Sequence, residues 1–363
     1  MLTRRRTKKF IYEQRYNPYV VGEAVHDPEM FFGRATAMQD IFQSIRNNSL
    51  CLTGERRIGK TTLLEHIDKN MAVPFFSFFC NLESVKEAFF FSRIMQHLVN
   101  KVRSIWPESL PGLVLFEKER HEYDEIDFEE DIESVLDFLR KNYAPDASVI
   151  MCLDEIDATQ EFAPNIHQSL RNVFQTYHGM IRMVAAGVSI KRGEWRLPTS
   201  PWYNFFEFKD VSELDRESAE RLIIMPVIGF YSYDIGSLDF IPYKTDSKPF
   251  YIQMICKKAI NKILDEKRRK VTLEDVKTIY DNLIRSELNR EFENFWENLS
   301  AELQKTILQA MKDEDTPVSA ASERELMNNT YNHGHRVIKA QNGKLKFATM
   351  FRDWLKINYI SEN

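Results

Sequence analysis

The 363-residue sequence predicts an α/β fold in which a parallel sheet lies between two layers of helices. Between about residues 49 and 210, short apolar runs alternate with helical patterns, which is typical of a parallel sheet covered on both faces. From about residue 212 the pattern becomes mostly helical, and it ends in an Asn342-Gly343 hairpin signal. A helical lid domain and a C-terminal winged-helix domain are therefore expected after the sheet.

The predicted elements follow in chain order. Strands are expected at 49–53, 74–80, 148–153, 182–188 and 205–209. Helices are expected near 35–47, 60–70, 85–104, 127–143, 162–178, 213–225, 249–265, 272–289, 300–312 and 322–331. The hairpin is expected over 337–347. These elements suggest a basic arm at 1–18, an α/β domain at 19–211, a helical lid at 212–290 and a winged helix at 291–363.

Composition is that of a soluble globular protein, with 43% hydrophobic and 28% charged residues and a net charge of −5. This charge gives nucleic acid no general attraction, so such a role needs a local patch. The arm carries five cations and is either a solvated tail or a contact for an anionic partner: Arg4, Arg5, Arg6, Lys8 and Lys9. Scattered cysteines, no signal peptide and no membrane-length apolar run predict a cytoplasmic protein without a membrane partner.

A phosphate-binding loop is the most informative motif. Gly54-Glu-Arg-Arg-Ile-Gly59-Lys60-Thr61 follows an apolar run and precedes a helical pattern. Such a strand–loop–helix turns successive N–H groups toward an anion. Lys60 adds charge for the β/γ-phosphates, and the Thr61 hydroxyl can bind Mg²⁺. The sequence therefore predicts the P-loop NTPase type of fold and a site for ATP or ADP with Mg²⁺.

Acids at the end of the apolar run 149–153 complete the expected site. Asp154 is assigned to the magnesium ion and Glu155 to activation of the attacking water, although acids also end strands merely as caps. Ser189, after a further strand, either senses the γ-phosphate or caps a loop. Lys60, Glu155 and Ser189 are the catalytic candidates, and slow ATP hydrolysis is expected. His333 and His335 lack further metal-ligand spacing.

Several segments together resemble the archaeal-type and STAND P-loop ATPases within the AAA+ class. They are Asn17–Gly22, Phe31–Arg34, Gly54–Thr61, Leu153–Ile156, Val211–Ile224, Lys248–Gln253 and Trp354. The resemblance implies a switch in which ADP holds the domains closed and ATP permits assembly or partner binding. It also implies an adenine pocket closed by the lid residue Pro249. Nucleotide contacts are expected from Phe32, Gly33, Arg34, Gly54, Arg56, Arg57, Ile58, Gly59, Lys60, Thr61, Thr62 and Pro249.

Two positions depart from the family pattern. Ser247 replaces the lid glycine, and Asn204-Phe205 stands where some members carry Gly-Arg. Because of the second departure, no arginine is assigned as an arginine finger that acts on another subunit. Arg171, Arg192 and Arg196 are interpreted as surface residues. Arg56 and Arg57 within the loop could meet phosphate, pair with acids or reach another subunit.

Two functions remain open. The first is a regulatory ATPase that binds Mg-ATP/ADP between the α/β domain and the lid and controls homo-oligomerisation or an unknown protein partner. The second is an AAA+ ATPase that engages duplex DNA, resembling origin-recognition or transposition-regulator proteins. Residues 330–363 carry six cations against two acids, which favours DNA, whereas Glu323 and Glu325 in the candidate recognition helix disfavour it. A scaffold that binds nucleotide without hydrolysis is a third reading.

Overall fold

The computed structural model describes residues 15–23, 25, 30–107, 112–188, 192–333 and 337–360, without the side chains of 192–193 and 327–333. The chain divides into two compact units. The sheet unit comprises residues 34–54 and 60–211. The helical unit comprises the chain up to residue 33, residues 55–59 and the chain from residue 212 onward. Each unit is described by itself.

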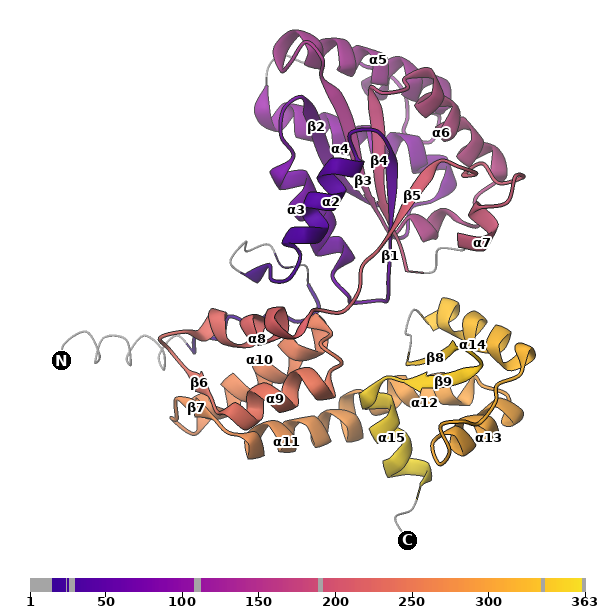
Figure 1. The fold of residues 1–363 in the computed structure, drawn as a ribbon. Helices are drawn as coiled ribbons and strands as arrows, with labels where there is room; N and C mark the ends of the chain where they lie inside the picture. The colour runs from indigo at the N-terminus through magenta and orange to yellow at the C-terminus, as the bar shows by residue number, and fades with distance from the viewer. Residues whose placement is uncertain are drawn as a thin grey trace, which may run out of the picture. The chain divides into compact units, whose positions relative to one another are not determined.

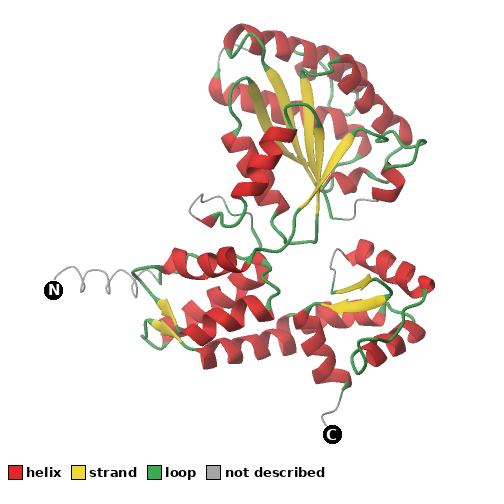
Figure 2. Cartoon of the chain, in the orientation of Figure 1, coloured by secondary structure: helices red, strands yellow, loops and turns green. Residues whose placement is uncertain are grey.

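A five-stranded parallel sheet forms the centre of the sheet unit (Figures 1 and 2). Its strand order is β2-β3-β4-β1-β5, and every neighbouring pair is parallel. All five predicted strands are confirmed. Their bounds are Ser49–Thr53 (β1), Phe75–Asn81 (β2), Ser148–Asp154 (β3), Ile181–Ala186 (β4) and Phe206–Asp210 (β5).

Helices cover both faces of this sheet, so the predicted three-layer arrangement is confirmed. On one face, α4 to α6 share a core with strand residues such as Cys51 and Met151. Helix α3 is not part of that core and contacts β2, β3 and β4 from the other face. Helix α2 contacts β1. Strand residues 149–153 are fully buried, which explains their continuous apolar run. The helices are Ala35–Ser44 (α2), Lys60–Asn70 (α3), Phe90–Ile105 (α4), Glu125–Asn142 (α5), Pro164–Thr176 (α6) and Arg192–Trp195 (α7).

The lid part of the helical unit packs its helices around a second core that includes the N-terminal segment. The buried Tyr19 donates its hydroxyl hydrogen bond to the Ile223 carbonyl, and Asn17 Nδ2 donates to the Lys257 carbonyl at 2.8 Å. The elements are Arg216–Ile224 (α8), Ser232–Tyr233 (β6), Ile235–Lys244 (α9), Pro249–Asp265 (α10), Lys270–Val271 (β7) and Leu273–Asn282 (α11). Helix α9 was not predicted from the sequence.

The winged-helix part contains the predicted hairpin, whose turn residues Asn342 and Gly343 have φ angles of 55° and 72°. Two successive positive φ angles are those of a type I′ turn. Buried Trp354 packs on Phe351 and donates Nε1–H to Asn289 Oδ1 at 2.8 Å. The elements are Asn289–Glu297 (α12), Ala301–Ala310 (α13), Ala320–His333 (α14), Ile338–Gln341 (β8), Lys344–Phe347 (β9) and Thr349–Tyr359 (α15).

The helix predicted over 272–289 is wrong in its extent. Helix α11 ends at Asn282, a π-helical turn occupies Leu283–Glu287, and α12 continues to Glu297. All four cysteines are buried and free. Within the described ranges, no helix combines the length and the apolar character needed to cross a bilayer.

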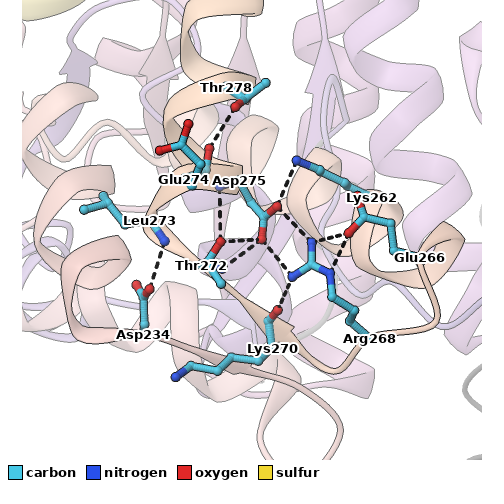
Figure 3. A network of polar contacts seen from close by, with 10 residues as sticks. All are labelled: Asp234, Lys262, Glu266, Arg268, Lys270, Thr272, Leu273, Glu274, Asp275 and Thr278. Atoms are coloured by element: carbon cyan, nitrogen blue, oxygen red, sulfur yellow. Dashed lines mark hydrogen bonds and ion pairs between the residues drawn. The ribbon is translucent and has the colours of Figure 1, made fainter.

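Asp275 fixes the start of α11 through charged hydrogen bonds (Figure 3). Arg268 Nη1 and Nη2 donate to its two carboxylate oxygens at 2.9 and 2.8 Å, and Lys262 Nζ lies 2.8 Å from Oδ1. The carboxylate also accepts the N–H of Thr272 at 2.9 Å, which completes a capping box. Burial alone would raise the pKa of Asp275, but Arg268, Lys262 and Thr272 outweigh it and hold that pKa well below its ordinary value.

Asp275→Asn is expected to destabilise the helical unit by about 1–3 kcal/mol at pH 7, a range reduced because Arg268 and Lys262 are about one third exposed. Because the folded pKa is lowered, the carboxylate's stabilisation is complete above the ordinary Asp range and is lost as pH falls through the folded value. Urea unfolding, monitored by amide hydrogen exchange in α10 and α11 from pH 7 to pH 3, checks this. The exposed Glu274→Gln on the same helix is the control. The difference in free energy of unfolding between Asp275→Asn and wild type should shrink in acid, and a difference that grew would contradict this prediction.

Candidate nucleotide site

Lys60 lies at the first residue of α3, directly after the loop glycine Gly59. Its side chain is buried, and Nζ donates to the Gly54 carbonyl at 3.0 Å. Gly59 has a φ of 101°, a value that suits glycine and few other residues. Thr62 follows in the first turn of α3. The sequence motif thus forms the strand–loop–helix on which phosphate binding depends.

Thr61 and Asp154 come together although they are far apart in the sequence. Thr61 Oγ1 donates to Asp154 Oδ2 at 2.6 Å, and Asp154 is 2% exposed at the end of β3. Burial raises the pKa of Asp154, and the hydrogen bond from Thr61 opposes this. A hydroxyl beside a buried carboxylate is a donor set that fits Mg²⁺. Their assignment as metal ligands stays a prediction.

Glu155 adopts a left-handed backbone conformation, with a φ of 54°, immediately after Asp154. This conformation is uncommon for residues with side chains and often accompanies a functional position. Burial raises the pKa of Glu155 to about 7, and the neighbouring carboxylates of Asp157 and Asp154 add to the effect. A carboxylate in such surroundings is suited to accepting a proton.

Two predicted residues of the sheet unit remain, Ser189 and Arg34. Ser189 lies outside the described residues. Its neighbour Val188 donates its N–H to Asp157 Oδ2 at 3.3 Å, so Asp157 connects the end of β4 to the segment after β3. Arg34 is buried at the N-terminus of α2.

Arg171 and Arg196, two candidates for an arginine finger, contact other residues of this chain. Arg171 donates to the carbonyls of Pro201 and Tyr203, the latter at 2.9 Å, and so holds the segment before β5. The Arg196 guanidinium lies 5.3 Å from the centre of the Phe208 ring. The side chains of Arg192 and of His333, and all of His335, lie outside the described part. Among described residues, no cluster of three or more His, Cys, Asp or Glu residues could hold a metal ion.

Loop residues 55–59 belong to the helical unit. Arg57 has a φ of 64°, and its guanidinium lies 4.4 Å from the centre of the Phe250 ring. Its Nη1 is 3.3 Å from Glu291 Oε2. The sequence left phosphate, an acid or another subunit as partners of Arg57, and the structure shows an acid. Ile58 is buried, and Arg56 is exposed. Pro249 occupies the first turn of α10, next to Phe250.

Glu55 is a loop residue for which the sequence predicts no role. It is buried, and its carboxylate lies 2.7 Å from Lys248 Nζ and 3.2 Å from Lys339 Nζ. Burial would raise the pKa of Glu55, yet Lys248 and Lys339 together lower it below the ordinary value. No local signal predicts this pairing, because the partners lie about 190 or more residues away.

Phe32 and Gly33 pack on α8 in the helical unit. Phe32 is partly buried against the lid core, and the Arg221 guanidinium is 5.8 Å from the centre of its ring. Gly33 has a φ of 68°, and a Cβ atom there would lie 2.6 Å from Ser218 Cβ and 2.8 Å from Leu214 Cδ2. Only glycine allows this close approach of the segment to α8.

Gly33→Ala is expected to destabilise the helical unit by about 2–4 kcal/mol, because it combines an unfavourable φ with overpacking. Gly22→Ala is the matched control, since Gly22 also has a positive φ (92°) but open space at its Cβ position. The control should lose only about 1 kcal/mol. Chemical denaturation of both variants checks this, and equal losses would show that the contact with Ser218 and Leu214 is unimportant.

Comparison with known proteins agrees with this fold. No family model and no curated protein sequence matches the chain. Among solved structures, the Holliday junction branch migration motor RuvB of Thermotoga maritima aligns with a TM-score of 0.50 at 12% identity, covering 90% of this chain and 95% of that one. The Orc1 protein of Aeropyrum pernix in complex with DNA gives 0.49 at 13% identity, covering 91% and 94%. Cdc6p from Pyrobaculum aerophilum gives 0.46 at 15% identity, covering 96% of each chain.

The sheet order, the loop and the acids after β3 define the class of fold. The chain has a P-loop fold like that of RuvB, with a parallel five-stranded sheet followed by a helical lid and a C-terminal winged helix. At these identities the RuvB match supports the fold alone, and the two matches below 0.5 support no argument about this chain.

Proposed function

We propose that the protein is a regulatory ATPase that binds Mg-ATP or Mg-ADP at its phosphate loop. The observation that carries this proposal is the contact between Thr61 and Asp154 at 2.6 Å, with Lys60 and Glu155 directly beside it in sequence. These residues supply an anion-binding loop, two oxygen ligands for Mg²⁺ and a carboxylate that can orient water. Together they are the parts that phosphoryl transfer from a nucleoside triphosphate to water requires.

Each residue of this chain then has one task. Lys60 binds the terminal phosphates, and Gly59 leaves its backbone N–H open to them. Thr61 and Asp154 hold the Mg²⁺ ion, which when bound neutralises charge on the phosphates. Glu155 orients the attacking water and accepts its proton. The resemblance also implies contacts with the base from Phe32 and Gly33.

A switch function is favoured because the phosphate loop is tied to the helical unit. Residues 55–59 contact α10 through Phe250, α12 through Glu291 and β8 through Lys339. A nucleotide that changes this loop therefore acts on elements of both the lid and the winged helix. The output we propose is ATP-dependent assembly of the chain with itself or with a protein partner, in the manner of the STAND ATPases that the sequence resembles.

The DNA-binding alternative is weakened by the partners of the winged-helix cations. Lys344 pairs with Asp315, Arg352 lies 3.3 Å from Glu314, and Lys339 pairs with Glu55. Lys346 and Lys356 are exposed and make no ion pair with a described residue. Much of the positive balance of residues 330–363 is thus offset within the chain, although exposed pairs such as Lys344–Asp315 could exchange partners.

Size-exclusion chromatography with light scattering tests the proposal under ADP, ATP and ATP plus duplex DNA. ATP should increase the molar mass without DNA, and ADP should not. Salt-sensitive migration with DNA, lost in the Lys344→Glu/Lys346→Glu variant, would establish the DNA-binding function instead. A chain that binds neither ATP nor ADP in equilibrium titration would overturn both.

A further inference from the structure

The buried carboxylate of Glu55 collects cations from two separate parts of the helical unit. Lys248 immediately precedes α10 of the lid, and Lys339 lies on β8 of the winged-helix hairpin. The side chains of Glu55 and Lys248 are 9% and 12% exposed, whereas that of Lys339 is 45% exposed. Lys339 also lies 3.6 Å from Glu213. One loop residue therefore connects the phosphate loop to the lid and to the hairpin.

A second connection lies two residues further along the same loop. Arg57 stacks on Phe250 of α10, and its guanidinium reaches Glu291 in the first turn of α12. The loop residues Glu55, Arg57 and Ile58 and their neighbours Lys248, Phe250 and Val337 enclose a cavity of only about 10 Å³, so the loop is closely packed at this point. Covalently, this packed segment is bounded by Gly54 and Lys60, the residues that flank the phosphates in a loop of this kind.

Restraints on such a loop affect its affinity for phosphate. A loop that is already held in its binding conformation loses less conformational freedom when a ligand arrives, so it binds more tightly. The same free energy acts in reverse, because a ligand that fixes the loop also strengthens the contacts that fix it. The exposed Lys339 is the weaker of the two lysine contacts and is therefore the one that nucleotide can make or break.

Building on the proposed function, we propose that the Glu55–Lys339 ion pair couples nucleotide occupancy of the phosphate loop to attachment of the winged-helix hairpin. Nucleotide in the loop strengthens the attachment, and an attached hairpin slows nucleotide release. Glu55 is in this sense a coupling residue, distinct from the groups that touch phosphate. Lys248 keeps Glu55 in place when the contact with Lys339 is broken.

The test uses the full chain with a fluorescent ADP analogue and Mg²⁺. Lys339→Gln is expected to raise the dissociation constant about fivefold, mainly through faster dissociation. Lys346→Gln, on the neighbouring strand of the same hairpin, is the control and should match wild type. Glu55→Gln should weaken binding about tenfold, because both lysines lose their partner. Adding Lys339→Gln to Glu55→Gln should then have no further effect.

Hydrogen exchange of residues 338–347 provides the second readout. In the nucleotide-free chain, Lys339→Gln and Glu55→Gln should exchange faster than wild type and Lys346→Gln, and ADP should slow exchange only where the pair is intact. Equal dissociation constants for Lys339→Gln and Lys346→Gln, or additive losses in the double variant, would overturn the coupling. If wild type binds no nucleotide, the proposed function fails, and the exchange of the nucleotide-free hairpin still decides whether the pair holds it.

Discussion

Lys60→Ala is expected to weaken ATP and ADP binding by at least about 100-fold, which corresponds to the loss of a strong charge-assisted contact. The side chain is buried, and its Nζ donates a hydrogen bond to the Gly54 carbonyl, at the start of the loop. Its positive charge is therefore already placed where the loop turns back on itself. Without it, the loop keeps its backbone N–H groups but loses the charge that meets the terminal phosphates.

Isothermal titration with Mg-ADP and Mg-ATP measures this effect. Lys69→Ala is the matched control, because Lys69 lies on the same helix, has a side chain that is 48% exposed, and lies 4.0 Å from Glu65. It should bind as wild type does. Unfolding by urea should show that both variants are folded. Binding that survives in Lys60→Ala would remove the loop from the nucleotide site.

The strands could be predicted because burial on both faces leaves a continuous apolar run, as at residues 149–153. The lid was harder. Helix α9 contains Pro242 in its interior, which lowers helical propensity, and only packing in the second core compensates. The π-helical turn at Leu283–Glu287 carries neither glycine nor proline, so no local signal marks the break between α11 and α12.

The site residues likewise divide into those that the local sequence predicts and those that it does not. The loop from Gly54 to Thr61 and the acids Asp154 and Glu155 form local motifs, and such motifs can be read without knowledge of the fold. The partners of Glu55 cannot, because a lysine at position 248 or 339 looks like any other surface lysine. Their proximity to Glu55 arises from the packing of the helical unit and from nothing in their immediate sequence.

Glu155→Gln is expected to retain bound Mg-ATP while turnover falls by about 100-fold or more. The amide is nearly the same size as the carboxylate, so nucleotide contacts made by the loop should persist. It cannot accept a proton from the attacking water, which removes the role proposed for Glu155. The surroundings that raise the pKa of Glu155 to about 7, chiefly burial, also suggest that removing one negative charge beside Asp157 and Asp154 will not unfold the site.

Two measurements separate catalysis from binding. Phosphate release at saturating ATP gives turnover, and equilibrium titration of ATP gives affinity. Glu83→Gln is the matched control, because Glu83 is exposed and influences the pKa of Glu155 less than Asp157 and Asp154 do. It should hydrolyse ATP at nearly the wild-type rate. Unchanged hydrolysis in Glu155→Gln would assign water activation to another group, and Asp157, whose Oδ2 already accepts the Val188 N–H, would be the next residue to replace.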